Sequence, residues 1–272
     1  MKDEIISLAK KLISIPSTVD NISALQKVLE IAEENIDAPF LQKFSQNDNP
    51  SLFAANRKDF SEKFRLVLNA HIDVVPGRED QYTPVIKDAK LFGRGAADMK
   101  SAAAVIILVF NQLVNKVNFP LGLQITTDEE TGGHNGTKFQ LEKGLKTDFA
   151  ISGELTNLSI NLKAKGIIQL SILSSGKTAH SAYPWNGENA LWKLVDILHS
   201  LKEKFPVPQK EAWETSINLA KIETSNLTNN KIPNDALAKL DIRFTPEQSS
   251  AVRDELEKIK NMGFEIIIGE DE

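Results

Sequence analysis

The sequence contains no cysteine, which excludes disulfide bonds, thiolate catalysis and metal sites built on sulfur. It has no excess of positive charge either: 32 Lys and Arg stand against 37 Asp and Glu, for a formal net charge of -5 at pH 7. Nucleic-acid binding needs clustered Lys and Arg, so no nucleic-acid partner is expected. Any metal site must use His, Asp and Glu, and the expected partners are small molecules or proteins.

Long hydrophobic runs are also missing. The longest apolar stretch, residues 102–110, is too short to cross a membrane. Over residues 1–17 the apolar residues are spaced as one face of an amphipathic helix, and charged residues interrupt them too often for a signal peptide. These patterns predict a cytoplasmic protein without a membrane partner.

The composition and length are typical of a globular chain with two domains: 272 residues, of which 41% are hydrophobic and 25% charged. In the first predicted domain, residues 1–163, helices alternate with short apolar runs. This pattern predicts an α/β fold with βαβ units and a largely parallel sheet. The predicted strands are residues 64–69, 121–126 and 149–151, the main predicted helix is residues 99–114, and residues 45–51 are expected to form a polar loop.

The second predicted domain, residues 164–272, and the chain leading into it follow a different pattern. The order strand, helix, strand, strand, helix, strand predicts a βαββαβ unit, an α+β, ferredoxin-like domain with one antiparallel sheet and two helices. The predicted strands are residues 159–173, 215–222, 236–244 and 264–268, and the predicted helices are residues 188–201 and 246–262.

Polar and acidic residues follow directly after three predicted strands of the first domain. They are His71 and Asp73 in HIDVVP, Glu129 and Glu130 in TTDEETGG, and Glu154 in SGEL. Because the carboxyl ends of parallel strands meet at one edge of a sheet, we expect these side chains to converge there. One imidazole among several carboxylates suits zinc or a similar divalent ion.

Each motif also has an ordinary structural explanation. In the H-x-D pair, Asp73 is placed to orient the ring of His71, but a simple loop pair has the same spacing. Asp98 lies in GRGAADMKS, a glycine-bracketed turn before a helix, where an N-cap is an equal explanation. The acids after the other two strands also fit solvated loops. Their joint occurrence at neighbouring strand ends favours a metal site.

The motifs HIDVVP, GRGAADMKS, DEETGG and the following GE resemble, in order and spacing, those of a zinc-dependent metallohydrolase family. This family contains acetylornithine deacetylase, succinyl-diaminopimelate desuccinylase, carboxypeptidase G-type peptidases and aminoacylases. The resemblance continues through KTAHSAYPWNGENAL and INLAKIETSNLTNNKIPNDALAKLDIR. It implies a zinc-peptidase-like catalytic domain with a mixed sheet and a lid and dimerisation domain. The implied reaction is removal of the acyl group from an N-acyl amino acid, in amino-acid metabolism.

The resemblance also implies roles for the residues at the strand ends. Glu129 is the expected general base, and Asp73 the partner that orients His71. A cis peptide is expected after Asp98. The implied ligands, for one or two zinc ions with cobalt or manganese as alternatives, are His71 and Glu154 for the first ion, Glu130 for the second and Asp98 as the bridge.

In the second domain the resemblance implies contacts with substrate and with a second copy of the chain. His180 matches a histidine that reaches into the partner subunit's active site and stabilises the oxyanion. Asn230 and Arg243 match lid residues that contact substrate, and the arginine fork suits a carboxylate. By residue type alone, His180 is a surface residue and Arg243 a surface charge on a strand. A homodimer through this domain is expected.

The sequence departs from the family pattern in its histidines, which are His71, His134, His180 and His199. Family members return from the lid to the catalytic domain and add a late histidine that completes the second metal site. His199 is explained as a helix residue near a C-terminal end, and His134 is a candidate replacement ligand. Without a replacement, the second ion is expected to bind weakly, whereas the first site keeps the layout of a mononuclear catalytic zinc site.

This departure predicts a chain truncated at its C-terminus, with apolar surface exposed on the catalytic sheet. An incomplete reading frame, a split enzyme completed by another polypeptide and a shortened natural protein all fit. The alternatives to the deacylase are a dipeptidase or carboxypeptidase of the same family, acting on short peptides, and a catalytically silent dimerisation or regulatory protein.

Overall fold

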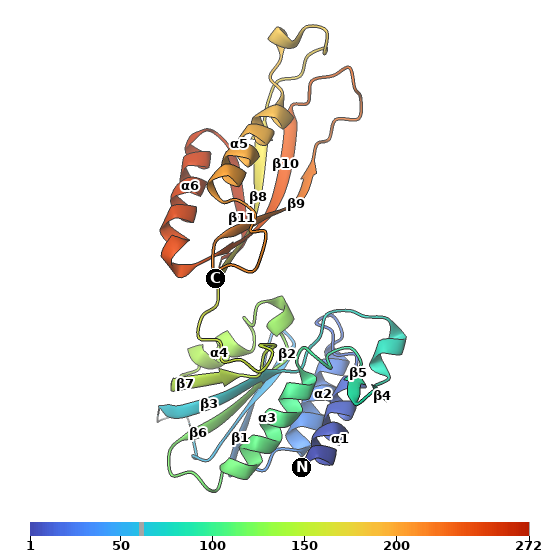
Figure 1. Cartoon of the computed structure of the whole chain (residues 1–272), viewed down its shortest axis with the longest axis vertical. Coiled ribbons are helices and arrows are strands. Elements are labelled where there is room, and N and C mark those ends of the chain that lie inside the picture. The colour runs from blue at the N-terminus through green and yellow to red at the C-terminus, as the bar shows by residue number, and fades with distance from the viewer. Residues whose placement is uncertain (60–62, 272) are drawn as a thin grey trace. The chain divides into compact units, whose positions relative to one another are not determined.

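The computed structural model describes residues 1–59 and 63–271, and the chain forms two compact units, Met1–Ser159 and Ile160–Glu272 (Figure 1). The elements of the first unit are α1 (Lys2–Ile13), α2 (Ile22–Glu34), β1 (Phe40–Gln46), β2 (Asn49–Ala55), β3 (Phe64–His71), η1 (Glu79–Tyr82), β4 (Val85–Lys87), β5 (Lys90–Phe92), α3 (Lys100–Leu113), β6 (Leu121–Thr126), η2 (Glu129–Thr131), α4 (Thr137–Glu142) and β7 (Thr147–Ser152). Within the described residues, none of the helices is long and apolar enough to span a bilayer.

The main sheet of the first unit is mixed, with strand order β1-β2-β6-β3-β7. β3 runs parallel to both β6 and β7, while β2 pairs antiparallel with β6 and with β1. The α/β class and the mixed sheet are confirmed, and so are the predicted strands β3, β6 and β7 and the helix α3. A largely parallel sheet is too strong a description, because β1 and β2 add an antiparallel hairpin.

The prediction of a polar loop at residues 45–51 is wrong. β1 continues to Gln46 and β2 begins at Asn49, so Asn47 and Asp48 form a two-residue turn. Their φ angles are +48° and +63°, the left-handed conformation that matches the twist of a hairpin and that Asn and Asp tolerate. The polar sequence therefore marks a tight turn between two paired strands.

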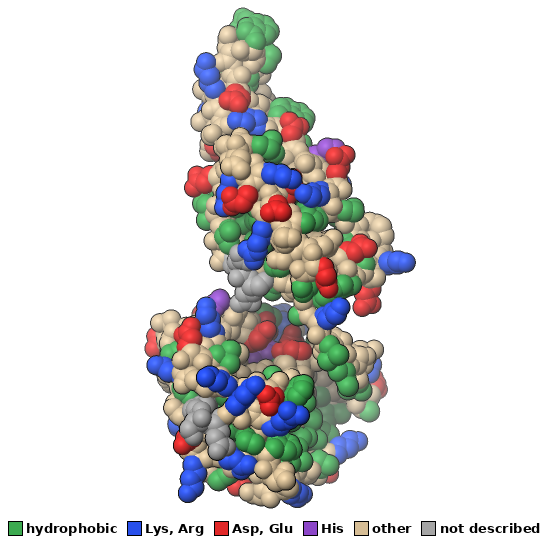
Figure 2. All heavy atoms as spheres, turned by 90° about the vertical axis from the view of Figure 1, so that its left-hand side faces the viewer, with side chains coloured by type: hydrophobic (Ala, Val, Ile, Leu, Met, Phe, Trp, Pro, Cys, Tyr) green, Lys and Arg blue, Asp and Glu red, His purple; other side chains and the backbone are tan. Residues whose placement is uncertain are grey.

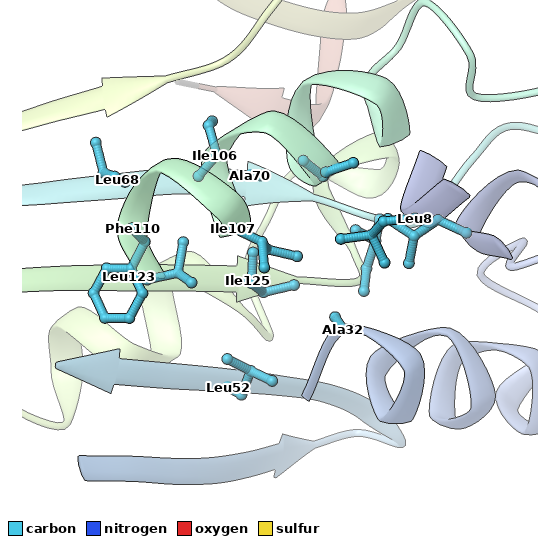
Figure 3. Packing of buried hydrophobic residues seen from close by; sticks show 14 of the residues in the cluster. Leu8, Ala32, Leu52, Leu68, Ala70, Ile106, Ile107, Phe110, Leu123 and Ile125 are labelled. Atoms are coloured by element: carbon cyan, nitrogen blue, oxygen red, sulfur yellow. The ribbon is translucent and has the colours of Figure 1, made fainter. Parts of the chain in front are cut away.

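The core of the first unit lies between the sheet and helices α1, α2 and α3. Ile107 and Phe110 of α3 point toward Ile125 and Leu123 on β6 (Figure 3). α3 packs against the sheet and against α1. Most of its surface is therefore buried, which agrees with its largely apolar sequence. This packing fixes the start of α3, and with it the turn that carries Asp98, against the end of β3.

The second unit has the predicted βαββαβ order. Its elements are β8 (Gly166–Ser175), η3 (Pro184–Asn186), α5 (Ala190–Lys204), β9 (Ser216–Glu223), β10 (Asp235–Phe244), η4 (Pro246–Gln248), α6 (Ser249–Asn261) and β11 (Glu265–Asp271). The sheet is antiparallel, with order β11-β8-β10-β9. Alternate residues of β8 and β10 pack with α5 and α6 in a separate core.

The strand predicted over residues 159–173 begins only at Gly166. Ile160 and Leu162 alternate with polar residues, as in a half-buried strand, but their side chains are 89% exposed. An alternating pattern forms a strand only where a neighbouring strand supplies hydrogen bonds and a core covers one face. Residues 160–165 pair with no strand among the described residues.

Apolar side chains are exposed on both units (Figure 2). On β7, at the end of the sheet order in the first unit, Phe149 is 59% and Ile151 52% exposed. These two side chains form exposed apolar surface on an edge strand of the sheet.

The α3 packing can be tested with two substitutions on the same helix. Ile107→Ala, at a fully buried position, is expected to lower the free energy of unfolding by about 2–5 kcal/mol, because it removes buried methyl groups and leaves a cavity. Val105→Ala, at a position 39% exposed, is the matched control and is expected to change it by less than about 0.5 kcal/mol. Urea unfolding followed by circular dichroism measures both, and equal effects would contradict the packing described.

Candidate metal centre

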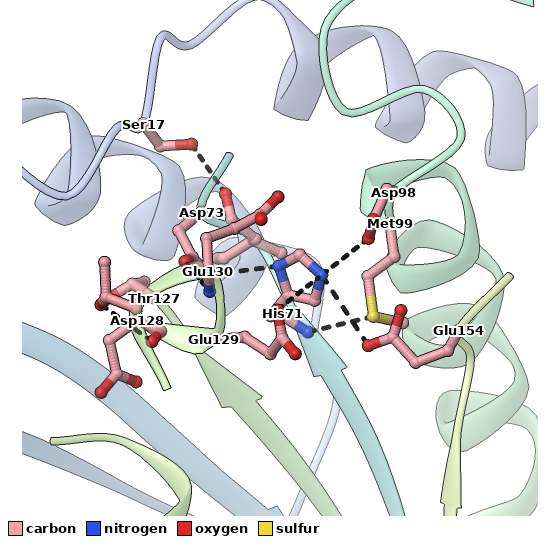
Figure 4. A network of polar contacts seen from close by, with 12 residues as sticks. Ser17, His71, Asp73, Asp98, Met99, Thr127, Asp128, Glu129, Glu130 and Glu154 are labelled. Carbon is pink, nitrogen blue, oxygen red and sulfur yellow. Dashed lines mark hydrogen bonds and ion pairs between the residues drawn. The ribbon is translucent and has the colours of Figure 1, made fainter. Parts of the chain in front are cut away.

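His71 is the last residue of β3, and its side chain is fully buried. Its Nδ1 lies 3.2 Å from Oδ1 of Asp73, which is also fully buried (Figure 4). Because a carboxylate accepts hydrogen bonds, Nδ1 carries the hydrogen of this pair. Asp73 thereby orients the ring and leaves Nε2 directed toward Asp98, whose Oδ1 lies 3.0 Å away.

His71, Asp98 and Glu154 form a group whose potential ligand atoms all lie within 4.8 Å of one another. Asp98 comes from the turn before α3, and Glu154 follows the end of β7. Because β3 and β7 are parallel neighbours, His71 and Glu154 reach the same edge of the sheet. The predicted convergence of strand ends is therefore observed, and acidic side chains and a histidine lie close together on the first unit (Figure 2).

Glu129 and Glu130 lie in η2, which two residues separate from the end of β6, and their side chains make different contacts. Oε2 of Glu129 is 3.8 Å from Nε2 of His71, and its side chain is 53% exposed. The backbone N–H of Glu130 donates to Oδ2 of Asp73 at 3.0 Å, and its carboxylate accepts from the backbone N–H of Val75. Glu130 therefore borders the group of His71, Asp98 and Glu154 without belonging to it.

The loop after β6 turns sharply at the two glycines that follow the glutamates. Gly132 and Gly133 both have left-handed φ angles, +96° and +65°. The carboxylate of Asp128, which is 1% exposed, accepts from the backbone N–H groups of Asn135 and Gly136. These contacts close the loop behind the two glutamates.

The turn before α3 shows the expected cis peptide between Asp98 and Met99. The explanation of Asp98 as an N-cap is wrong, because Met99 occupies the N-cap position of α3. The carboxylate of Asp98 contacts His71 instead, and the backbone N–H of His71 donates to Sδ of Met99 at 3.4 Å.

The charged residues of this group shift one another's pKa values. Burial lowers the pKa of His71, but the hydrogen bond to Asp73 and the charges of Asp73, Glu129 and Glu154 outweigh burial and raise it to about 9. Burial is also the largest cause that raises the pKa of Glu129 and of Glu154, and neighbouring carboxylates raise it further. A bound cation would relieve this repulsion.

The donors present fit a zinc ion. An imidazole nitrogen with its other nitrogen held by a carboxylate is a usual zinc ligand, and two carboxylates complete a set of three. His134 is exposed and does not belong to the group of potential ligands found among the described residues. His199 pairs with Glu203 on the surface of α5, at 3.3 Å, as a helix residue would.

Two buried polar residues near the group were missed by the sequence reasoning. Lys100 is fully buried, and its Nζ donates to the carbonyl oxygen of Ile15 at 2.7 Å. Burial lowers the pKa of Lys100 to about 7 although the charge of Asp73 raises it. A lysine at the start of an otherwise apolar helix is a sequence signal that could have indicated a buried lysine here. Ser17, fully buried against the loop after His71, stood in no recognisable motif.

The predicted substrate residues lie in the second unit. His180 is exposed, and its Nδ1 accepts from the backbone N–H of Ala182 at 3.1 Å. The backbone carbonyl of Asn230 accepts from Ser181 at 2.9 Å, so the chain pairing brings His180 and Asn230 close together. Arg243 lies on β10, and its guanidinium binds both carboxylate oxygens of Asp241, at 2.7 and 2.9 Å.

Zinc binding near pH 7 is expected to release at least one proton. With a pKa of about 9, the imidazole of His71 is protonated in the metal-free protein at this pH and must lose a proton before Nε2 can ligate. Zinc affinity should therefore rise with pH up to about that value. Calorimetric titrations in two buffers of different ionisation enthalpy measure the protons released, and identical heats in both would contradict this expectation.

Comparison with known proteins agrees with this geometry. The sequence model of Peptidase family M20/M25/M40 matches residues 67–255. A succinyl-diaminopimelate desuccinylase of Pelagibacter ubique is 33% identical over 276 residues, covering 93% of this chain and 72% of the relative. A relative of the same name from Buchnera aphidicola is 32% identical and covers 92% of this chain and 70% of its own length.

Solved structures show the same fold. A crystal structure of a M20 family metallo-carboxypeptidase from Sulfolobus solfataricus superposes with a TM-score of 0.72 at 20% identity, covering 98% of this chain and 78% of that one. A tripeptidase from Staphylococcus aureus superposes with a TM-score of 0.71 at 17% identity, covering 100% of this chain and 76% of that one. The chain therefore belongs to Peptidase family M20/M25/M40 and is a metallohydrolase that acts on amide bonds.

Proposed function

We propose that this protein removes the acyl group from an N-acyl amino acid, with N-succinyl-diaminopimelate as the first substrate to test. The observation that carries this proposal is the group of His71, Asp98 and Glu154 at one edge of the sheet. The substrate class comes from the relatives named succinyl-diaminopimelate desuccinylase, which are 33% and 32% identical to this chain.

The proposed metal ligands are His71, Asp98 and Glu154, which would hold a zinc ion, with cobalt or manganese as alternatives. When bound, the ion supplies positive charge that polarises the amide carbonyl and acidifies the attacking water. Glu130 is proposed as a ligand of a second ion together with Asp98. Burial is the largest cause that raises the pKa of Glu130, and the charge of Asp98 raises it further, so a cation between the two carboxylates would be stabilised.

Glu129 is the proposed general base. Its carboxylate lies beside Nε2 of His71 yet remains half exposed, so it can reach both the metal group and a water molecule. Burial raises its pKa, which moves the group toward the working pH of a base. Glu129 takes one proton from the attacking water as the new C–O bond forms, and it gives that proton to the amine nitrogen as the C–N bond breaks. Asp73 keeps the His71 ring in place throughout.

Three residues of the second unit are proposed to act on the substrate: His180 as a donor to the oxyanion, and Asn230 and Arg243 as binding residues. Arg243 already binds a carboxylate in the bidentate manner that the proposal needs, because it holds Asp241 in this way. The pair is partly exposed, so a substrate carboxylate can compete with Asp241 at modest cost.

A homodimer through the second unit is part of the proposal. β9 is the last strand in the sheet order, and Leu219 and Ile222 on it are 46% and 43% exposed. A cavity of about 600 Å³, lined mainly by apolar side chains of α5 and β9, lies beside this edge. An exposed edge strand with apolar side chains is suited to pairing with a second copy. The cytoplasmic location stays a prediction.

A carboxypeptidase or dipeptidase is the second candidate function. A relative named probable carboxypeptidase, from Emericella nidulans, is 29% identical over 277 residues. The same metal group and base would serve both reactions, so only the substrate separates them. Cleavage rates of zinc-loaded protein on N-succinyl amino acids, N-acetyl amino acids and dipeptides distinguish the two functions. Faster cleavage of dipeptides than of acylated amino acids would favour the carboxypeptidase.

Removing the metal ligand tests whether the chain is catalytically silent. His71→Ala is expected to abolish tight zinc binding, because the single imidazole of the group is lost. His199→Ala, on the surface of α5, is the matched control and is expected to bind zinc as the unaltered chain does. Calorimetric zinc titration measures both. A chain without a tight site, or one whose affinity does not depend on His71, would support the silent alternative.

Removing the base should separate chemistry from metal binding. Glu129→Gln is expected to lower kcat by about 100- to 10,000-fold, because the amide cannot accept the proton of water. Zinc affinity should stay close to that of the unaltered chain, since Glu129 is not among the proposed ligands. Glu142→Gln, an exposed glutamate at the end of α4, is the control. Initial rates of desuccinylation and zinc titrations measure the two effects, and an active Glu129→Gln variant would contradict the assignment.

A further inference from the structure

The turn between α1 and α2 packs directly against the loop that follows His71. In this turn Ser17 is fully buried, and its Oγ donates to the carbonyl oxygen of Ile72 at 2.7 Å (Figure 4). The carbonyl oxygen of Ser17 accepts from the backbone N–H of Val74 at 3.0 Å. Ser17 therefore holds the backbone on both sides of Asp73.

Asp73, which lies between these two hydrogen-bonded residues, contacts both His71 and Glu130. Its Oδ1 contacts Nδ1 of His71 and its Oδ2 accepts from the backbone N–H of Glu130. A shift of Asp73 would therefore move the imidazole that ligates the metal and loosen the loop that carries both glutamates. Residues that hold the partner of a metal-ligating histidine contribute to metal affinity without touching the ion.

The same turn is tied to the segment that carries Asp98. Nζ of the buried Lys100, two residues after Asp98, donates to the carbonyl oxygen of Ile15, two residues before Ser17. The turn from Ile15 to Ser17 thus connects the start of α3 with the loop after β3. Through Asp73 it also reaches η2.

We propose that Ser17 is a positioning residue of the metal centre, which presets Asp73, and through it His71 and the loop at Glu130, before a metal ion binds. Ser17 lies outside residues 67–255, the part of the chain that the family model matches. The inference rests on the metal site of the proposed function. A buried serine that only stabilises the fold is the ordinary alternative.

The test compares two fully buried serines of the same unit. Ser17→Ala removes the donor to Ile72 and keeps the backbone bond to Val74. Ser51→Ala is the matched control, because the hydroxyl of Ser51 on β2 bonds Gln140 at 2.9 Å. Both variants lose one buried hydrogen bond, so thermal melts should show similar destabilisation.

The first readout is the exchange rate of the Glu130 amide hydrogen in the metal-free protein, measured by NMR. We expect it to rise on the order of tenfold in Ser17→Ala relative to Ser51→Ala, because a looser Asp73 lets this amide open locally. The second readout is Zn²⁺ affinity by calorimetry. We expect a loss on the order of threefold to tenfold in Ser17→Ala, just below that seen when a direct partner of a ligand is removed, and no loss in Ser51→Ala.

Equal exchange rates at Glu130 in the two variants would overturn the inference and leave Ser17 as a purely structural residue. If the unaltered chain binds no zinc, the proposed function fails, but the exchange rates in metal-free protein still decide the role of Ser17. If Ser17→Ala does not fold, amide hydrogen exchange in the unaltered chain at low urea concentration replaces this test. The inference then requires the amide hydrogens of Val74 and Glu130 to become exchangeable in the same local unfolding event, and exchange through separate events would overturn it.

Discussion

The buried hydrogen bond between His71 and Asp73 is the contact on which the geometry of the candidate metal centre depends. Both side chains are fully buried, so neither can exchange this partner for water without opening the structure. In the neutral imidazole the bond keeps the hydrogen on Nδ1, and in either form it directs Nε2 toward Asp98. The second oxygen of Asp73 accepts from the backbone N–H of Glu130, so one carboxylate positions both the ring of His71 and the loop beside it.

The sheet decides which carboxylates can reach Nε2. β3 lies between β6 and β7 and runs parallel to both, so Glu129 and Glu154 arrive from the neighbouring strand ends. Asp98 arrives from the turn that the packing of α3 holds in place. Grouping these acids has an energetic cost, because burial and mutual repulsion raise the pKa of both glutamates. The same repulsion between carboxylates that destabilises the metal-free group favours the binding of a divalent cation there.

The second unit has its own core between α5, α6 and the antiparallel sheet, and it carries the proposed substrate residues. These residues are more exposed than the pair of His71 and Asp73 in the first unit: His180 is exposed, and the side chain of Arg243 is 44% exposed. Exposed polar side chains can exchange their partners for a ligand more easily than the buried pair of His71 and Asp73 can. The imidazole proposed as a metal ligand therefore lies in a buried, hydrogen-bonded setting, and the proposed substrate residues lie in an exposed one.

The sequence by itself determined the order of the elements and the residues that could bind metal, because apolar periodicity and strand-end motifs are local. β6 was predicted at its observed bounds, and the convergence of His71 with Glu154 followed from the parallel order. Tertiary structure alone decided the hairpin at Asn47, the position of Glu130 beside the candidate ligand group and the burial of Ser17 against the loop after His71. Each of these features depends on which segment, distant in the sequence, packs against the residue, and a local sequence pattern does not predict that contact.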